Sequence, residues 1–267
     1  MSRNHRRYAL SGFMILVGMV ACALPGQAIS PAAPSNQIQP TLISTTQATQ
    51  TKQATATSTT IPTETLVPTP KISLYGTSLV IQEDQSTLFT DHKAGIQLVI
   101  PPGWMTLRVN EDEYYKAFAL DVVIENPPIS DRLTRIQDVN LDYHRLEAID
   151  IRPGHIQDGI ISDINVVFEE GDVRTLEEWE KAERNRKSPW ADYKFISSSY
   201  RETENGTRVL VIEHSWSAGE ETIYYRGVFF PLSSGTLVLD FYSNFDFRDT
   251  VLPDFEQVVN SVTLLDP

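Results

Sequence analysis

Between residues 30 and 70 the chain carries a tract that is too polar and too rich in proline to build a hydrophobic core. Serine, threonine and proline fill 22 of its 41 positions, and Lys52 and Glu64 are its only charged residues. Such a composition buries too little apolar surface to offset the entropy of ordering the chain. We therefore expect residues 22–71 to form a disordered, partly extended tether. Residues 72–267 are long enough to form one globular domain with a sizeable core.

Residues 1–21 have the features of a signal peptide. Arg3, Arg6 and Arg7 form a basic start, and the apolar run Tyr8–Ala21 follows. This run has 14 residues, whereas a transmembrane helix needs about 20, so a cleaved signal is favoured over an uncleaved membrane anchor. General secretory export is favoured over twin-arginine export, because the residues that flank the arginine pair depart from that consensus.

The end of the apolar run, Met19-Val20-Ala21-Cys22, resembles the lipobox of bacterial lipoproteins. Cleavage between Ala21 and Cys22 frees an amine, and the Cys22 thiol carries a diacylglyceryl group. Two or three acyl chains anchor a protein stably, because each buried CH₂ adds about 0.8 kcal/mol. We predict lipidation at Cys22 and a lipid-anchored position at the cell membrane, with the domain on the extracytoplasmic side. The alternative is that Cys22 is only a small apolar residue of the signal.

The charge of the chain excludes one class of partner. The formal net charge is −13, and loss of the three signal arginines takes it to −16. A strongly acidic chain repels nucleic acid and anionic headgroups, so no nucleic-acid partner is expected. Cys22 is also the only cysteine, which excludes an intrachain disulfide and a thiolate zinc site.

The globular part shows a series of strands, turns and two amphipathic helices. Asn205-Gly206 is a strong hairpin signal, and the turn 91–95 separates another strand pair. The alternation of Leu237, Leu239 and Phe241 with more polar neighbours predicts that these three side chains face the core. The segment 118–125 fits either a strand or a helix. Strands are expected at 87–90, 96–100, 143–151, 160–168, 194–200, 207–216, 221–230, 235–243 and 261–265.

Two segments have the pattern of helices. Thr175 and Glu178 form a capping box, in which the threonine hydroxyl and the glutamate satisfy the first free amides. This helix is expected to bury an apolar side formed by Leu176, Trp179 and Ala182. A second helix is expected to begin near Pro253 and to continue through Phe255, Val258, Val259 and Val262.

Consecutive hairpins and two covering helices predict an α+β fold with a mainly antiparallel sheet. The segments Phe89-Thr90-Asp91 and 95–104, which ends in Pro101-Pro102-Gly103-Trp104, resemble the opening of PsbP-like (Mog1- and DcrB-related) domains. Residues 255–262 resemble the closing helix of those domains. The resemblance implies an α/β/α sandwich, and a non-enzymatic binding or assembly module that carries no catalytic residues.

The domain lacks the local motifs of catalytic and cofactor sites. There is no His-Glu-x-x-His, Gly-x-Ser-x-Gly or phosphate-loop spacing. The acidic runs 111–113 and 169–172 are expected to be solvated loops, although either run, or Asp246 with Asp249, could hold Ca²⁺ weakly. No catalytic residue, metal site or cofactor is predicted. The four histidines of the domain are scattered and are expected to be ordinary core or surface residues: His92, His144, His155 and His214.

The late part of the domain is rich in aromatic residues. We expect helices to cover both faces of the sheet and to bury them; the alternative is an exposed aromatic surface. The favoured function is a membrane-anchored module that binds an unknown envelope protein, a glycan or a small ligand. The alternatives are an envelope hydrolase or metal-dependent enzyme, with a site assembled from separate strands, and a purely structural envelope component. The aromatic residues are Trp216, Tyr224, Tyr225, Phe229, Phe230, Phe241, Tyr242, Phe245 and Phe247.

Overall fold

The computed structural model describes residues 70–157 and 159–265. The predicted signal peptide, the cleavage site at Ala21 and Cys22, and residues 22–69 of the tether lie outside these residues. Within the described part, no helix combines the length and the apolar character that crossing a membrane requires.

The centre of the domain is a seven-stranded sheet in the order β4-β5-β6-β10-β9-β8-β7. Each neighbouring pair is antiparallel, as the series of hairpins predicted. The gap between the expected strands 221–230 and 235–243 is shorter than predicted, because β9 extends through Pro231 to Leu232. The strands are β4 (Trp104–Leu107), β5 (His144–Asp150), β6 (Asp163–Glu170), β7 (Lys194–Glu202), β8 (Arg208–Ala218), β9 (Glu221–Leu232) and β10 (Gly235–Asn244).

A second, four-stranded sheet has the order β1-β2-β3-β11. The predicted hairpin around residues 91–95 joins β2 and β3. Its turn is fixed by Asp91, whose carboxylate accepts hydrogen bonds from the amides of Lys93 and Ala94, both at 2.9 Å. Gly95 closes the turn at φ +71°, a conformation that glycine adopts without strain. The strands are β1 (Thr77–Ile81), β2 (Thr87–Asp91), β3 (Ile96–Ile100) and β11 (Thr263–Leu264).

Five helices complete the described part of the domain, rather than the two that the sequence predicted. The capping box of Thr175 and Glu178 is confirmed, and the ambiguous segment 118–125 contains a helix. The helices are α1 (Asp112–Ala117), α2 (Asp121–Ile124), α3 (Pro127–Ile136), α4 (Leu176–Arg184) and α5 (Arg248–Ser261). α1 and α2 have only six and four residues, and α3 begins with two prolines, although its buried Ile129, Leu133 and Ile136 follow a helical period that the prediction missed.

Two details of the predicted helices were wrong. Ala182 is exposed, and Glu183 is the third buried residue of α4 beside Leu176 and Trp179. The last helix begins at Arg248, five residues before Pro253. It begins early because Val251 is fully buried in the main core, and packing of that side chain stabilises an additional turn.

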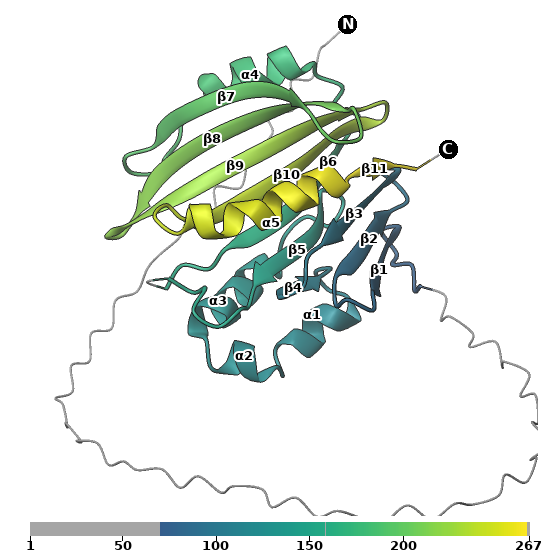
Figure 1. The fold of residues 1–267 in the computed structure, drawn as a ribbon, viewed down its shortest axis with the longest axis vertical. Helices are drawn as coiled ribbons and strands as arrows, with labels where there is room; N and C mark the ends of the chain where they lie inside the picture. Colours follow the sequence, from purple (N-terminus) through teal and green to yellow (C-terminus); the bar gives the residue numbers. More distant parts are fainter. Residues whose placement is uncertain (1–69, 158, 266–267) are drawn as a thin grey trace, which may run out of the picture. The chain divides into compact units, whose positions relative to one another are not determined.

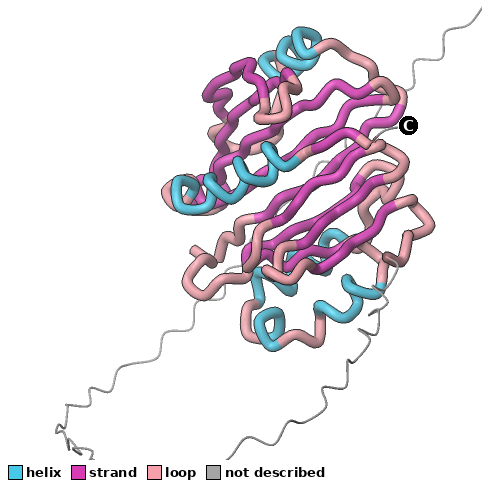
Figure 2. Tube along the Cα trace, turned by 45° about the vertical axis from the view of Figure 1, so that its right-hand side comes forward, coloured by secondary structure: helices cyan, strands magenta, loops and turns pink. Residues whose placement is uncertain are grey.

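The large sheet is covered on both faces. One face packs against the small sheet and α5, which contacts both β3 and β10 (Figures 1 and 2). Leu237, Leu239 and Phe241 lie in this main core, as predicted. The opposite face is covered by α3 beside β4 and β5 and by α4 beside β8. The fold is therefore α+β with helices on both faces of an antiparallel sheet, and the separate small sheet is an addition that the hairpin pattern did not reveal.

The Asn205-Gly206 turn also holds the end of α5. The side-chain amide of Asn205 donates to the carbonyls of Asn260 at 3.2 Å and Val262 at 2.9 Å. We expect Asn205→Ala to lower the free energy of unfolding by about 1–2 kcal/mol, because two carbonyls lose their donor. Urea unfolding of the full chain measures this loss. Ser234→Ala, in the exposed turn between β9 and β10, is the matched control, and an equal effect of both variants would contradict this role for Asn205.

Candidate functional site

Polar side chains cross the face of the large sheet that α3 and α4 cover. Neighbouring strands place them opposite one another in two rows, and residues directly opposite on adjacent strands point to the same face. We call these seven residues the polar strip. One row contains Glu147, Asn165 and Asp240, and the other contains Asp163, Tyr242, Tyr225 and His214.

At one end of the polar strip, two carboxylates share one guanidinium. Arg132 of α3 contacts Glu147 at 2.7 Å and Asp163 at 2.5 Å, and it donates to Asn165 at 3.1 Å. Glu147 and Asp163 are both buried. One cation cannot neutralise two buried acids, so the pKa values of the two acids become different.

The pKa values of Asp163 and Glu147 are shifted in opposite directions. Burial and the nearby charge of Glu147 raise the pKa of Asp163 to about 8, although Arg132 opposes this shift. Burial alone would also raise the pKa of Glu147, but Arg132 and His144 outweigh it and hold that pKa below its usual value. Glu147 is therefore the carboxylate that pairs with Arg132, and Asp163 holds a proton near neutral pH.

In the middle of the polar strip, a hydrogen bond between Tyr225 and Asp240 requires a glycine at position 227. The Tyr225 hydroxyl donates to the Asp240 carboxylate at 2.6 Å, and it passes over Gly227 to do so. A side chain at Gly227 would overlap that hydroxyl and approach the Phe229 ring to 3.2 Å. Burial raises the pKa of Asp240 to about 6, while the hydrogen bond from Tyr225 opposes the shift.

We expect Gly227→Ala to destabilise the domain by about 1–3 kcal/mol, because Tyr225 must move and Asp240 loses its donor. Tyr225→Phe removes the hydroxyl that the new methyl group would meet. The double variant is therefore expected to lose less stability than the two single losses added together. Urea unfolding of the three variants tests this, and strict additivity would show that the overlap is unimportant.

The other end of the polar strip is a buried histidine. His214 lies 3.3 Å from Glu183 of α4, and the Tyr193 hydroxyl lies 2.9 Å from its Nδ1. Burial alone would raise the pKa of Glu183, but the hydrogen bond from His214 and the charge of Arg186 give a net shift below its usual value. His214 is thus a core histidine with satisfied partners, which agrees with the sequence-based expectation.

A second histidine, His155, lies against a buried carboxylate near the surface. His155 Nδ1 lies 2.7 Å from the buried Asp150, which also binds Arg152 at 2.6 Å. Arg152 in turn contacts Asp254 of α5 at 2.6 Å. An Asp–His couple activates a nucleophile only when a hydroxyl, a thiol or a water lies at the second ring nitrogen. In the described chain, His155 has no hydrogen bond to a serine, threonine or cysteine side chain.

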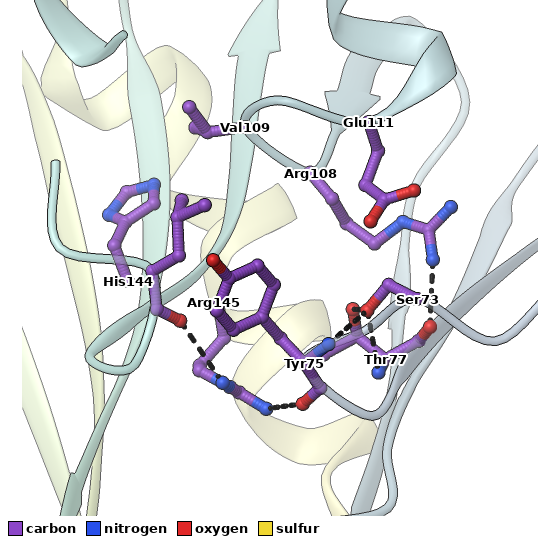
Figure 3. A pocket seen from close by; sticks show the side chains of 9 residues that line it. Ser73, Tyr75, Thr77, Arg108, Val109, Glu111, His144 and Arg145 are labelled. Carbon is purple, nitrogen blue, oxygen red and sulfur yellow. Dashed lines mark hydrogen bonds between the residues drawn. The ribbon is translucent and has the colours of Figure 1, made fainter. Parts of the chain in front are cut away.

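A small recess lies where the first described residues meet β4 and β5 (Figure 3). Its volume is about 10 Å³, which is room for about one water molecule. The two arginines that line it already bind the chain itself. Arg108 donates to the carbonyl of Thr77 at 2.7 Å, and Arg145 donates to the carbonyl of Tyr75 and pairs with the buried Asp91 at 2.6 Å. The arginines around the recess therefore hold the first described residues in place through these hydrogen bonds.

The acidic run 111–113 is tied into the same region. Glu113 contacts Arg108 at 2.5 Å, and the exposed Asp112 contacts Lys71 at 3.2 Å. The expectation of a freely solvated loop was therefore too simple, because one member of the run belongs to a largely buried ion pair.

The acidic run 169–172 surrounds Arg174, which contacts Glu169 at 3.2 Å and also pairs with Asp172. Burial and the hydrogen bond to Asp172 raise the pKa of Glu169 to about 7. Across residues 70–157 and 159–265, no group of three or more His, Cys, Asp or Glu side chains is arranged to hold a metal ion.

The late aromatic residues do not form an exposed surface. Their burial agrees with the favoured expectation, except that Trp216, Tyr225 and Tyr242 are packed against the loop residues Trp190 and Tyr193 rather than against a helix. Tyr242, Phe245 and Phe247 are half-buried. The fully covered members are Trp216, Tyr224, Tyr225, Phe229, Phe230 and Phe241.

Exposed apolar side chains occur in several parts of the domain, for example at Leu74 and Ile81, and one group that sequence reasoning missed lies along α1, α2 and the turn between them. We call Tyr115, Phe118, Leu120 and Ile124 the α1–α2 surface; Tyr115 is 58% exposed and Ile124 is 66% exposed. Exposed acids occur in the same ten residues of chain, at Asp121 for example. The only sequence signal was the apolar character of segment 118–125, which did not reveal which side faces solvent.

Comparisons with known proteins give a likeness at the level of solved structures only. No family model and no curated protein matches this chain. Several solved structures are similar, and three of them follow. A cyanobacterial PsbP from Synechocystis sp. PCC 6803 is 13% identical over 74% of this chain and 98% of its own, with a TM-score of 0.38. The protein PA94 of unknown function from Pseudomonas aeruginosa, described as a putative regulator, is 11% identical over 68% of this chain and 98% of its own, with a TM-score of 0.37.

The third is LpqN of Mycobacterium tuberculosis, described as involved in cell envelope biogenesis. It is 13% identical over 71% of this chain and 91% of its own, with a TM-score of 0.39. This chain is similar to PsbP-like structures. At these identities and TM-scores, function has to be argued from the residues of the chain itself.

Proposed function

We propose that this protein is a lipid-anchored envelope lipoprotein whose globular domain binds another envelope protein and performs no catalysis. The observation that carries the proposal is the α1–α2 surface. Four large apolar side chains stay in contact with water within ten residues of chain, and grouped exposed apolar side chains on a soluble domain are typical of interaction sites. The neighbouring acids, such as Asp112 and Asp121, favour a partner with basic residues around an apolar centre.

The buried carboxylates are paired with other residues of the domain, which supports a module without catalysis. Arg132 holds Glu147 and Asp163, and Asp240 is held by Tyr225. These carboxylates are engaged by neighbours within the fold. The hydrolase alternative needs a nucleophile beside the Asp150–His155 couple, and no serine, threonine or cysteine side chain of the described residues is hydrogen-bonded to His155.

The anchoring part of the proposal rests on the sequence before the domain. A lipid on Cys22 would hold the protein at the membrane, and the tether of residues 22–71 would let the acidic domain reach a partner away from the bilayer. As a flexible coil, such a tether spans on the order of 35 Å.

Cell fractionation tests the anchor. We expect the wild-type chain to sediment with the membranes and Cys22→Ala to lose at least about tenfold of that membrane-bound fraction, because acyl chains supply the affinity. Treatment with high salt is the control, since it releases proteins held by charge but not those held by lipid. Equal sedimentation of both chains would exclude lipid anchoring through Cys22.

Site-specific photocrosslinking tests the binding surface. A photoreactive amino acid replaces Tyr115 in the full chain in cells, and a second chain carries it at the exposed Ser233 as a control. We expect a discrete adduct with an envelope protein from position 115 only, and its loss when Phe118 and Ile124 are changed to serine. Adducts that are insensitive to these changes, or the same adducts from both positions, would contradict the proposal.

A further inference from the structure

The turn between β7 and β8 contains Asn205-Gly206, the only place in the chain where glycine follows asparagine. Both residues are exposed. The backbone nitrogen of the following residue can attack the side-chain amide of an asparagine. Glycine hinders this attack least, because it has no side chain and its backbone is the most mobile. The turn therefore presents a chemically reactive amide at the surface.

Hydrogen bonds on both sides hold the groups of this reaction apart. The side-chain nitrogen of Asn205 donates to the carbonyls of Asn260 at 3.2 Å and Val262 at 2.9 Å. The Gly206 N–H donates to the carbonyl of Thr203 at 2.9 Å. The attack needs a Gly206 nitrogen without its proton and an Asn205 side chain that is free to turn towards it, so both sets of contacts oppose the reaction. The end of α5 thus protects Asn205.

The segment that follows α5 is attached by few contacts. The Ser261 hydroxyl accepts from the amide of Val99 at 2.8 Å, and the Leu265 N–H donates to the carbonyl of Gly95 at 2.8 Å. Within residues 261–265, Val262 alone is buried. Segments with few buried contacts open more often than a whole domain unfolds. We therefore expect the end of α5 to detach from the turn while the rest of the domain stays folded.

We propose that Asn205 is a deamidation site, which reacts when the end of α5 detaches and whose product keeps that end loose. The Gly206 nitrogen forms a bond to the side-chain carbonyl carbon of Asn205. The carbon–nitrogen bond of the side-chain amide breaks, and the proton from Gly206 leaves with the ammonia. Water then opens the cyclic imide and leaves aspartate or isoaspartate at position 205. Water is the only co-reactant of this sequence of steps.

The product cannot restore the contacts of the amide. A carboxylate has no N–H, so the carbonyls of Asn260 and Val262 lose the hydrogen bonds that residue 205 donated. The new charge is next in the chain to Glu204, which accepts from the Asn260 side chain at 3.3 Å. It also lies at the C-terminal end of α5, where the helix dipole disfavours negative charge. The site is separate from the α1–α2 surface, so this proposal stands or falls independently of the proposed binding function.

Peptide mass spectra of the full chain test the reaction itself. The chain is incubated at mildly alkaline pH, either folded or unfolded in guanidinium chloride. Asn140, which is exposed and is followed by Leu141, is the internal control. We expect conversion at Asn205 and none at Asn140, at least about tenfold slower in the folded chain than in the unfolded chain. Equal rates in the two states, or no conversion at Asn205 in either, would overturn the proposal.

Two variants of the full chain test whether the end of α5 controls the reaction. Ser261→Ala removes the acceptor of the Val99 amide and loosens this end, so we expect conversion of Asn205 in the folded chain to rise about fivefold. Gly227→Ala, which weakens the opposite face of the sheet, is the matched control and should raise it less. An equal rise in both variants would mean that conversion follows unfolding of the whole domain, against the proposed control by α5.

The variant Asn205→Asp tests the effect of the product. Hydrogen exchange of the full chain, measured by mass spectrometry over residues 258–265, is compared for this variant, the wild type and Ser234→Asp. Ser234→Asp adds the same charge in the exposed turn between β9 and β10. We expect exchange over these residues to be about tenfold faster in Asn205→Asp alone. Exchange as slow as in the wild type would refute the loosening of α5.

Discussion

Replacing Arg145 by methionine is expected to cost about 3–5 kcal/mol of folding stability. Arg145 of β5 and Asp91 of β2 form an ion pair at 2.6 Å, and both side chains are 0% exposed. The substitution leaves the Asp91 carboxylate buried without its cation, although it still accepts from two amides of its own turn. Because the pair joins the two sheets, its loss weakens the contact between them.

Urea unfolding of the full chain, followed by tryptophan fluorescence, measures the loss. Arg184→Met is the matched control, because Arg184 pairs with Glu180 on the surface and exposed pairs contribute less than about 1 kcal/mol. The double variant Asp91→Asn with Arg145→Met is expected to be more stable than Arg145→Met alone, since it no longer buries a charge. A loss below about 1 kcal/mol for Arg145→Met would show that the pair is not a main link between the sheets.

Replacing Arg132 by methionine is expected to have a similar effect, about 3–5 kcal/mol, because it leaves the buried Glu147 carboxylate without the cation that it pairs with. Asp163→Asn should behave very differently. It removes the surplus acid and leaves Arg132 paired with Glu147 alone. We therefore expect Asp163→Asn to be neutral or stabilising at pH 8.

The pH dependence of Asp163→Asn follows from the raised pKa of Asp163. Its pKa is about 8 in the folded protein and 3.8 as an ordinary aspartate, so the folded state binds more protons between pH 4 and pH 8. Stability that depends on this group is present at low pH and is lost as the pH rises through that window. Relative to wild type, Asp163→Asn should gain on the order of 3–4 kcal/mol between pH 5 and pH 8. Unfolding curves at the two pH values test this, and an unchanged difference would contradict the shared-cation arrangement.

Local signals in the sequence predicted much of the fold. Each confirmed element depends on residues that are close in the chain: the turn around Asp91, the capping box of Thr175 and Glu178, and the Asn205-Gly206 hairpin. The alternation of Leu237, Leu239 and Phe241 predicted the core face for the same reason. Such local signals determine a secondary-structure element independently of the residues that pack against it in the fold.

The candidate sites depend on distant residues, and sequence patterns do not reveal those. The expected apolar side of α4 did not include Glu183, which is buried because His214, 31 residues further along the chain, lies against it. Arg132 reaches Asp163 from another element in the same way. The polar strip exists only through the register of several strands, so a shift of one residue in β6 would move Asp163 to the other face.

The most direct test of the account is the mass of the mature N-terminus, because the anchoring role of Cys22 is its central claim. Intact-mass and peptide spectra of the wild-type chain, purified from membranes, are compared with those of Cys22→Ala. We predict a wild-type chain that begins at Cys22 and carries two or three acyl chains, and a Cys22→Ala chain that carries none. A wild-type chain that retains residues 1–21 without acylation would contradict the account.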